Sequence, residues 1–102
     1  MVGSMFVIRF SKQAEKDRKL LKSAGLESKA KALLSVIAEN PFQDPPPYEK
    51  LLGNLDGFFS RRINIQHRLV YQVFLEKISI NGKEFSGTVK VARMWTHYAN
   101  LK

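Results

Sequence analysis

A carboxylate, several arginines and a late histidine are the residues of this chain whose types could do chemistry together. Glu49 lies just before a basic and aromatic stretch at residues 57–71, and His97 and Tyr98 come almost at the end of the 102 residues. A carboxylate can accept a proton, an imidazole can give one near neutral pH, and a guanidinium stabilises charge on phosphate oxygens. This set of groups could cut RNA by acid–base catalysis without a metal.

Each of these residues also has a simpler interpretation. A lone glutamate in a loop, such as Glu49, is usually only solvated, and a histidine near a chain end is usually just exposed. Arginines on strands can serve as cross-strand salt-bridge partners. We interpret His67 as an exposed residue of a tight turn. The acidic residues and the two histidines lack metal-ligand spacing, so we expect no metal and no cofactor.

The charge of the chain indicates a polyanionic partner. Seventeen lysines and arginines against nine acidic residues give a net charge of +8, which is typical of proteins that bind nucleic acid. A basic surface that only aids solubility is the plain alternative. In the second half of the chain the arginines are interleaved with aromatic residues, a pattern suited to phosphates and stacked bases. Composition therefore predicts a nucleic-acid partner, but it does not separate binding from cutting.

Length and composition predict one globular domain, which we place at residues 5–102, with residues 1–4 an added segment before a natural start at Met5. The absence of cysteine excludes a disulfide framework, thiolate catalysis and a cysteine zinc site. No apolar run is long enough to span a bilayer, and no charged segment followed by a long apolar stretch opens the chain. We therefore expect a soluble, cytoplasmic protein with no membrane partner.

The hydrophobic pattern predicts two helices and four strands. We expect a helix from Ser11 to about Ala24, a second from Leu26 to the Asn40–Pro41 step, and a loop over residues 41–56. The expected strands cover residues 6–10, 58–65, 68–80 and 88–96. The order β-α-α-β-β-β predicts an α+β domain, with both helices on one face of a mostly antiparallel sheet.

Strand alternation decides which side chains share a face of this sheet. In the strand that begins at Arg68, Leu69 and Tyr71 should lie under the helices, which leaves Arg68 on the open face. In the preceding strand Ser60 and Arg62 should share the more polar face. Arg62 and Arg68 are therefore predicted to reach the same open side.

One set of residues in this chain carries a family resemblance: residues 55–63, LDGFFSRRI, and 67–71, HRLVY, together with Glu49 ahead of Leu51 and Asn54, and the closing pair His97 and Tyr98. These residues closely resemble the YoeB (Txe) family of toxins, which belongs to the RelE-like superfamily of bacterial toxin–antitoxin systems. The resemblance extends from Met5 to Tyr98, and the family's fold has the predicted order of elements.

The resemblance implies a ribosome-dependent messenger-RNA endonuclease that inhibits translation. Glu49 matches the family's general base, Arg68 its phosphate-stabilising arginine, and His97 its general acid. Tyr98 matches an aromatic residue that positions the RNA, and Arg62 a basic contact near the phosphate. The neighbouring Arg61 and Lys50 are further predicted RNA contacts. The implied partners are mRNA on the ribosome, an acidic YefM/Axe-like antitoxin, and a second toxin copy in a dimer.

The chain departs from the family pattern in three places. Residues 99–102 continue beyond the His97–Tyr98 pair at which relatives commonly end, residues 77–87 form a longer turn, and Leu52 replaces a residue that is often basic. None of these changes removes a catalytic group. Two other functions remain open from the sequence: a non-catalytic basic toxin that binds nucleic acid or targets gyrase on the same fold, and a basic structural domain associated with ribosomes.

Overall fold

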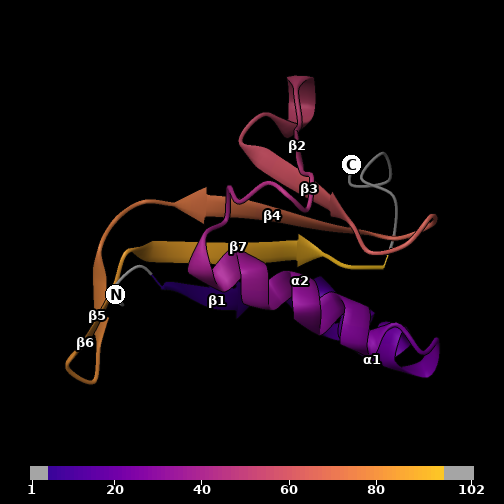
Figure 1. The fold of residues 1–102 in the computed structure, drawn as a ribbon, viewed down its shortest axis with the longest axis horizontal. Helices are drawn as coiled ribbons and strands as arrows, with labels where there is room; N and C mark the ends of the chain where they lie inside the picture. Colours follow the sequence, from indigo (N-terminus) through magenta and orange to yellow (C-terminus); the bar gives the residue numbers. More distant parts are fainter. Residues whose placement is uncertain (1–4, 96–102) are drawn as a thin grey trace.

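The computed structural model describes residues 5–95, which form two helices, one short 3₁₀ helix and seven strands (Figure 1). In chain order the elements are β1 (Phe6–Phe10), α1 (Lys12–Ser23), α2 (Glu27–Glu39), β2 (Glu49–Lys50), the 3₁₀ helix η1 (Gly53–Leu55), β3 (Phe58–Arg62), β4 (Arg68–Phe74), β5 (Ile78–Ile80), β6 (Lys83–Phe85) and β7 (Gly87–Arg93).

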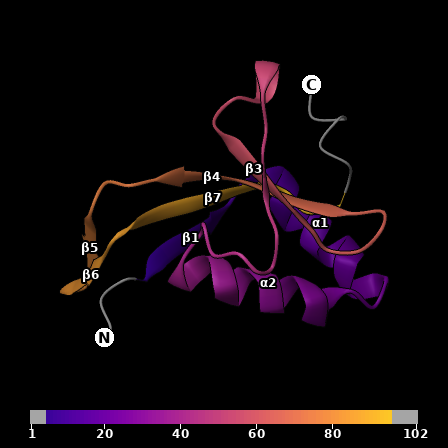
Figure 2. The same ribbon diagram turned by 45° about the horizontal axis from the view of Figure 1, so that its top comes forward.

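Five strands form the main sheet, in the order β1-β7-β4-β3-β2. Strand β1 pairs with β7 in parallel, and the other three pairings are antiparallel. Both helices lie on one side of this sheet (Figure 2). The predicted α+β class and helix-covered face are therefore confirmed. The sheet is mostly antiparallel, as predicted, with one parallel pairing. It has five strands rather than the predicted four, because β2 joins its edge.

Local signals in the sequence explain where the helices begin and end. The side chain of Ser11 accepts a hydrogen bond from the Ala14 amide at 3.0 Å and so caps the first turn of α1. Gly25, with a φ of +76°, lets the chain turn after α1, and the Leu26 amide then donates to the Leu21 carbonyl. Helix α2 ends one residue before Asn40, as the Asn40–Pro41 step predicts.

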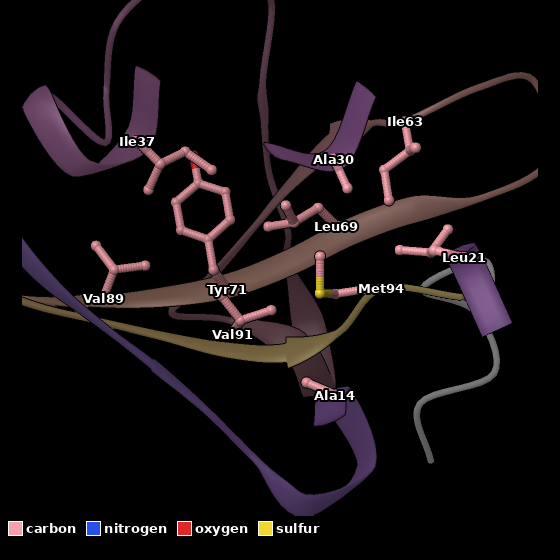
Figure 3. Packing of buried hydrophobic residues seen from close by; sticks show 10 residues of the cluster. All are labelled: Ala14, Leu21, Ala30, Ile37, Ile63, Leu69, Tyr71, Val89, Val91 and Met94. Carbon is pink, nitrogen blue, oxygen red and sulfur yellow. The ribbon is translucent and has the colours of Figure 1, made fainter. Parts of the chain in front are cut away.

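The hydrophobic core of residues 5–95 lies between the helices and the sheet (Figure 3). Its buried members are Ala14, Leu21, Ala30, Ile37, Ile63, Leu69, Tyr71, Val89, Val91 and Met94. Tyr71 is the polar exception, and its hydroxyl donates a hydrogen bond to the Pro41 carbonyl at 2.8 Å. Burial raises the pKa of the Tyr71 hydroxyl, so this donor stays protonated.

Three predicted strands are shorter in the structure, and the last of them, β7, ends at Arg93. Strand β3 ends at Arg62 rather than at residue 65, because the Asn64 side chain accepts from the Gln66 and His67 amides and shapes a loop over residues 63–67. Strand β4 ends at Phe74, and the rest of its predicted length belongs to the separate β5–β6 hairpin. Asn81 and Gly82 both have positive φ and form the turn of that hairpin.

Candidate active site

Glu49 and Arg68 meet on the open face of the sheet. The Oε1 atom of Glu49 lies 3.6 Å from Nη1 of Arg68. Glu49 is on β2 opposite Ser60 of β3, and Arg68 is on β4 opposite Arg62 of β3. Strand β2 forms the edge of the sheet next to β3 (Figure 1). Its pairing with β3 brings Glu49 within reach of Arg68.

These residues line an open pocket of about 310 Å³. Its walls are Pro47, Tyr48, Glu49, Ser60, Arg62 and Arg68. Arg62 and Arg68 are direct cross-strand neighbours, an arrangement of like charges that is unfavourable unless an anion lies between or beside them. Because the pocket offers one carboxylate against two guanidiniums, it is suited to a ligand with a negative charge, such as a phosphate.

Ser60 is a residue of this pocket that the sequence interpretation did not single out. The residue is 1% exposed, and within residues 5–95 its hydroxyl has no hydrogen-bond partner. An unpaired buried hydroxyl costs free energy, so a ligand that bonds to it gains affinity. The alternation that places Ser60 beside Arg62 on the polar face was the signal that could have identified it.

The prediction that Arg61 contacts RNA is wrong. Arg61 lies on the helix-covered face and is 1% exposed. Its guanidinium donates to the carbonyl oxygens of Pro41 at 3.0 Å, Gln43 at 2.9 Å and Pro46 at 2.6 Å, and its Nε donates to the Tyr71 hydroxyl at 3.0 Å. Arg61 thus holds the loop that leads to Glu49, and all of these bonds are internal to the protein.

Replacement of Arg61 with methionine is expected to destabilise the fold. The change leaves buried carbonyl groups without their donor, and hydrogen bonds to charged groups contribute about 1.5–3 kcal/mol each, so we expect a loss of about 3 kcal/mol or more in the free energy of unfolding. Urea denaturation followed by circular dichroism measures it. Arg62→Met, at the exposed neighbouring position, is the matched control. Equal stability of the two variants would contradict the role given to Arg61.

Lys50 has a different orientation from Glu49. It is exposed on β2, opposite Phe59. Successive side chains of a strand point to opposite faces, and Lys50 is not among the residues that line the pocket. An RNA contact by Lys50 stays a prediction.

His97 and Tyr98 lie outside the described residues, but the segment before them is firmly held through Met94. Asp17 of α1 is fully buried and accepts hydrogen bonds from Arg93 Nε at 3.0 Å and from the Met94 amide at 2.8 Å. Burial by itself would raise the pKa of Asp17, but the hydrogen bonds from Arg93, Met94 and Gln13 outweigh it and lower this pKa. The carboxylate therefore stays charged and fixes the end of β7 at neutral pH.

The interpretation of His67 as an exposed turn residue is also wrong. His67 is 6% exposed, and its ring stacks on Trp95 with 3.9 Å between ring centroids. The Nδ1 atom of His67 has no partner within residues 5–95. Because β4 and β7 are antiparallel, this stack forms at the start of β4, where Arg68 lies. The chain therefore reaches Trp95, two residues before His97, at the same end of the sheet as Arg68.

Residues 5–95 contain neither a cluster of metal-ligating side chains nor a membrane-spanning helix. In this part of the chain no three histidine, cysteine or acidic side chains lie together in a way that could hold a metal ion. Nor does either of its helices have the length and apolar character needed to cross a membrane.

Comparison with known proteins places these observations in a family. Residues 10–98 match the YoeB-like toxin family of bacterial type II toxin–antitoxin systems. The chain is 44% identical over 59 residues to Toxin YoeB of Synechocystis sp., a match that covers 58% of this chain and 62% of that relative. The matched stretch therefore spans less than two thirds of the length of this curated relative.

Solved structures agree with the family match over a larger part of the chain. YoeB in the YoeB–YefM complex from Staphylococcus aureus has a TM-score of 0.68 and 34% identity, with 93% of this chain and 100% of that chain covered. The YoeB dimer from the same organism has a TM-score of 0.67 and 32% identity, with the same coverage. The chain belongs to the YoeB-like toxin family of bacterial type II toxin–antitoxin systems.

Proposed function

We propose that this toxin is an endoribonuclease that cuts messenger RNA on the ribosome by metal-free acid–base catalysis. The observation that carries the proposal is the 3.6 Å approach of Glu49 to Arg68 within a pocket that also contains Arg62. In RNA, the 2′-hydroxyl is attached next to the phosphate that it attacks. The base that deprotonates this hydroxyl must therefore lie within a few ångströms of the cation that holds the phosphate.

Each proposed step has a residue of suitable chemistry. Glu49 takes the proton of the 2′-hydroxyl, and the 2′-oxygen then forms a bond to phosphorus. Arg68, with Arg62 beside it, stabilises the negative charge that builds on the non-bridging oxygens. The bond from phosphorus to the 5′-oxygen breaks, and His97 gives that oxygen a proton. The products are a 2′,3′-cyclic phosphate and a 5′-hydroxyl, so atoms and protons balance without water or a metal.

The proposed partners follow from charge and from the relatives. A net charge of +8 favours the phosphate backbone of message and ribosomal RNA, and we propose a cytoplasmic location because translation occurs there. The S. aureus relative is known in complex with YefM. We propose that an acidic antitoxin of that kind binds and covers the basic pocket of this toxin. The relative's dimer suggests that two toxin copies associate here as well.

Purified ribosomes that carry a defined message test the proposal. The unaltered toxin should cut the bound message, and His97→Ala should cut it at least about 100-fold more slowly, because a positioned acid contributes ~10²–10⁴-fold. Equal cutting by both proteins would refute the role of His97. RNA that is bound but never cut, or DNA damage through gyrase instead, would show that this toxin acts without ribonuclease chemistry.

A further inference from the structure

A second pocket lies on the other side of Arg62 from the candidate active site. It has a volume of about 270 Å³ and is formed between α2 and the segments around Pro46 and Ile63. Arg62 lines both pockets, and the adjacent prolines divide them, with Pro47 in the first and Pro46 in the second. The two pockets are therefore neighbours that share one guanidinium.

The wall between the pockets is held in place from inside the protein. The Pro46 carbonyl accepts a hydrogen bond from Arg61, and the same guanidinium binds the Pro41 and Gln43 carbonyls. A bound strand would therefore meet a wall whose backbone is already ordered, which reduces the entropy lost on binding.

The chemistry of the second pocket matches one nucleotide. Leu33, Val36, Pro46 and Ile63 supply apolar walls, while Lys29 and Arg62 are its charged residues and are both cations. Single-stranded bases bind to proteins by packing their faces on apolar or planar side chains while cations contact the phosphates. An apolar pocket with two cations and no acidic residue in its lining fits that combination.

We propose that this second pocket binds the base of a nucleotide next to the cleavage site, with Arg62 shared between the two phosphates and Lys29 on the outer one. The inference rests on the proposed function and adds a residue set that would influence which sequences are cut. An acidic antitoxin segment would suit the same charges. Continuity with the candidate active site through Arg62 favours the RNA strand.

Binding of short oligoribonucleotides tests the second pocket without any cleavage. The probes are 2′-O-methyl RNAs of two and three nucleotides, with the third nucleotide on either the 5′ or the 3′ side, because a blocked 2′-oxygen cannot attack. Stacking of one base on protein side chains typically tightens binding by about tenfold or more. With the full-length toxin, we therefore expect one of the three-nucleotide probes to bind about tenfold more tightly than the two-nucleotide probe, by fluorescence anisotropy.

Substitutions that fill or reverse the charge of the second pocket should remove this difference. Val36→Trp should abolish the gain from the third nucleotide and keep the affinity for two, and Lys29→Glu should reduce the gain severalfold. Ser35→Trp and Lys31→Glu are the matched controls, because both residues are exposed on α2 and neither lines the pocket. Thermal melts establish whether each variant is folded. If Val36→Trp does not fold, Lys29→Glu alone tests the second pocket.

The outcomes separate this inference from the proposed function. In one outcome the pocket variants no longer bind the three-nucleotide probe more tightly, and the unaltered toxin does not cut message. That outcome would support the second pocket as a base-binding site and refute the proposed ribonuclease activity. If the third nucleotide still tightened binding by the same factor in both pocket variants, the proposed role of the second pocket would be refuted, whether or not the toxin cuts RNA. Loss of antitoxin binding in Val36→Trp, with RNA binding intact, would reassign the pocket to the antitoxin and also overturn the inference.

Discussion

Glu49→Gln is expected to lower the single-turnover rate of message cleavage by ~10²–10⁴-fold, the contribution typical of a positioned base. Glutamine keeps the size and hydrogen-bonding capacity of the side chain but cannot accept the 2′-hydroxyl proton. The fold should be unaffected, because the side chain of Glu49 is 59% exposed and ion pairs at exposed sites contribute little to stability. Rates on ribosomes saturated with toxin measure the chemical step.

The control for this change removes the same charge elsewhere. Glu84 is exposed on the β5–β6 hairpin, and Glu84→Gln should cut at the unaltered rate. A Glu49→Gln protein that is folded and cuts within about threefold of the unaltered toxin would show that another group takes the proton.

Arg68→Ala is expected to lower the rate by ~10²–10³-fold, the usual cost of removing one group that stabilises an oxyanion. Arg68 and Arg62 occupy directly paired positions, and only together do they present two guanidiniums to one phosphate. Arg68→Lys should recover only part of the loss, because an ammonium cannot make the paired hydrogen bonds of a guanidinium. The defect should lie mainly in the rate at saturation and only weakly in the affinity for ribosomes.

Another arginine, Arg18, serves as the control for Arg68. Arg18 lies on α1, in an exposed ion pair with Glu15, and Arg18→Ala lowers the net charge by the same amount. If Arg18→Ala reduced cutting as strongly as Arg68→Ala, the effect of Arg68 would be one of overall charge, and its assignment to the phosphate would fail.

The parts of the fold that follow local rules could be predicted from the sequence. Alternation along β4 separated Arg68, on the open face, from Leu69 and Tyr71 in the core, because the period of a strand is two residues. The cap by Ser11 and the turn at Gly25 are equally local. These features depend on neighbours within a few positions in the chain.

The parts that depend on distant contacts could not be predicted. Arg61 sits in the same basic run as Arg62, and only the fold of the loop at residues 41–47 supplies the carbonyl groups that bury it. The stack of His67 on Trp95 likewise needs the pairing of β4 with β7. A run of charged residues in sequence therefore does not distinguish a ligand contact from an internal support.

The approach of Glu49 to Arg68 also depends on contacts between residues that are distant in the sequence. The two-residue strand β2 is too short to produce any alternation in the sequence, yet its pairing with β3 carries Glu49 to the open face. The residue type of Glu49 and the family resemblance identified it as a candidate base. Its position beside Arg68 could be determined only from the structure.

The chemical identity of the cut RNA ends tests most directly whether a base and a phosphate-holding arginine act on one linkage. Mass spectrometry of message cut on ribosomes should find a 2′,3′-cyclic phosphate, or the 3′-phosphate from its opening, and a 5′-hydroxyl on the downstream fragment. A 3′-hydroxyl paired with a 5′-phosphate would mean that water, and not the neighbouring 2′-oxygen, attacks phosphorus, and it would contradict the account.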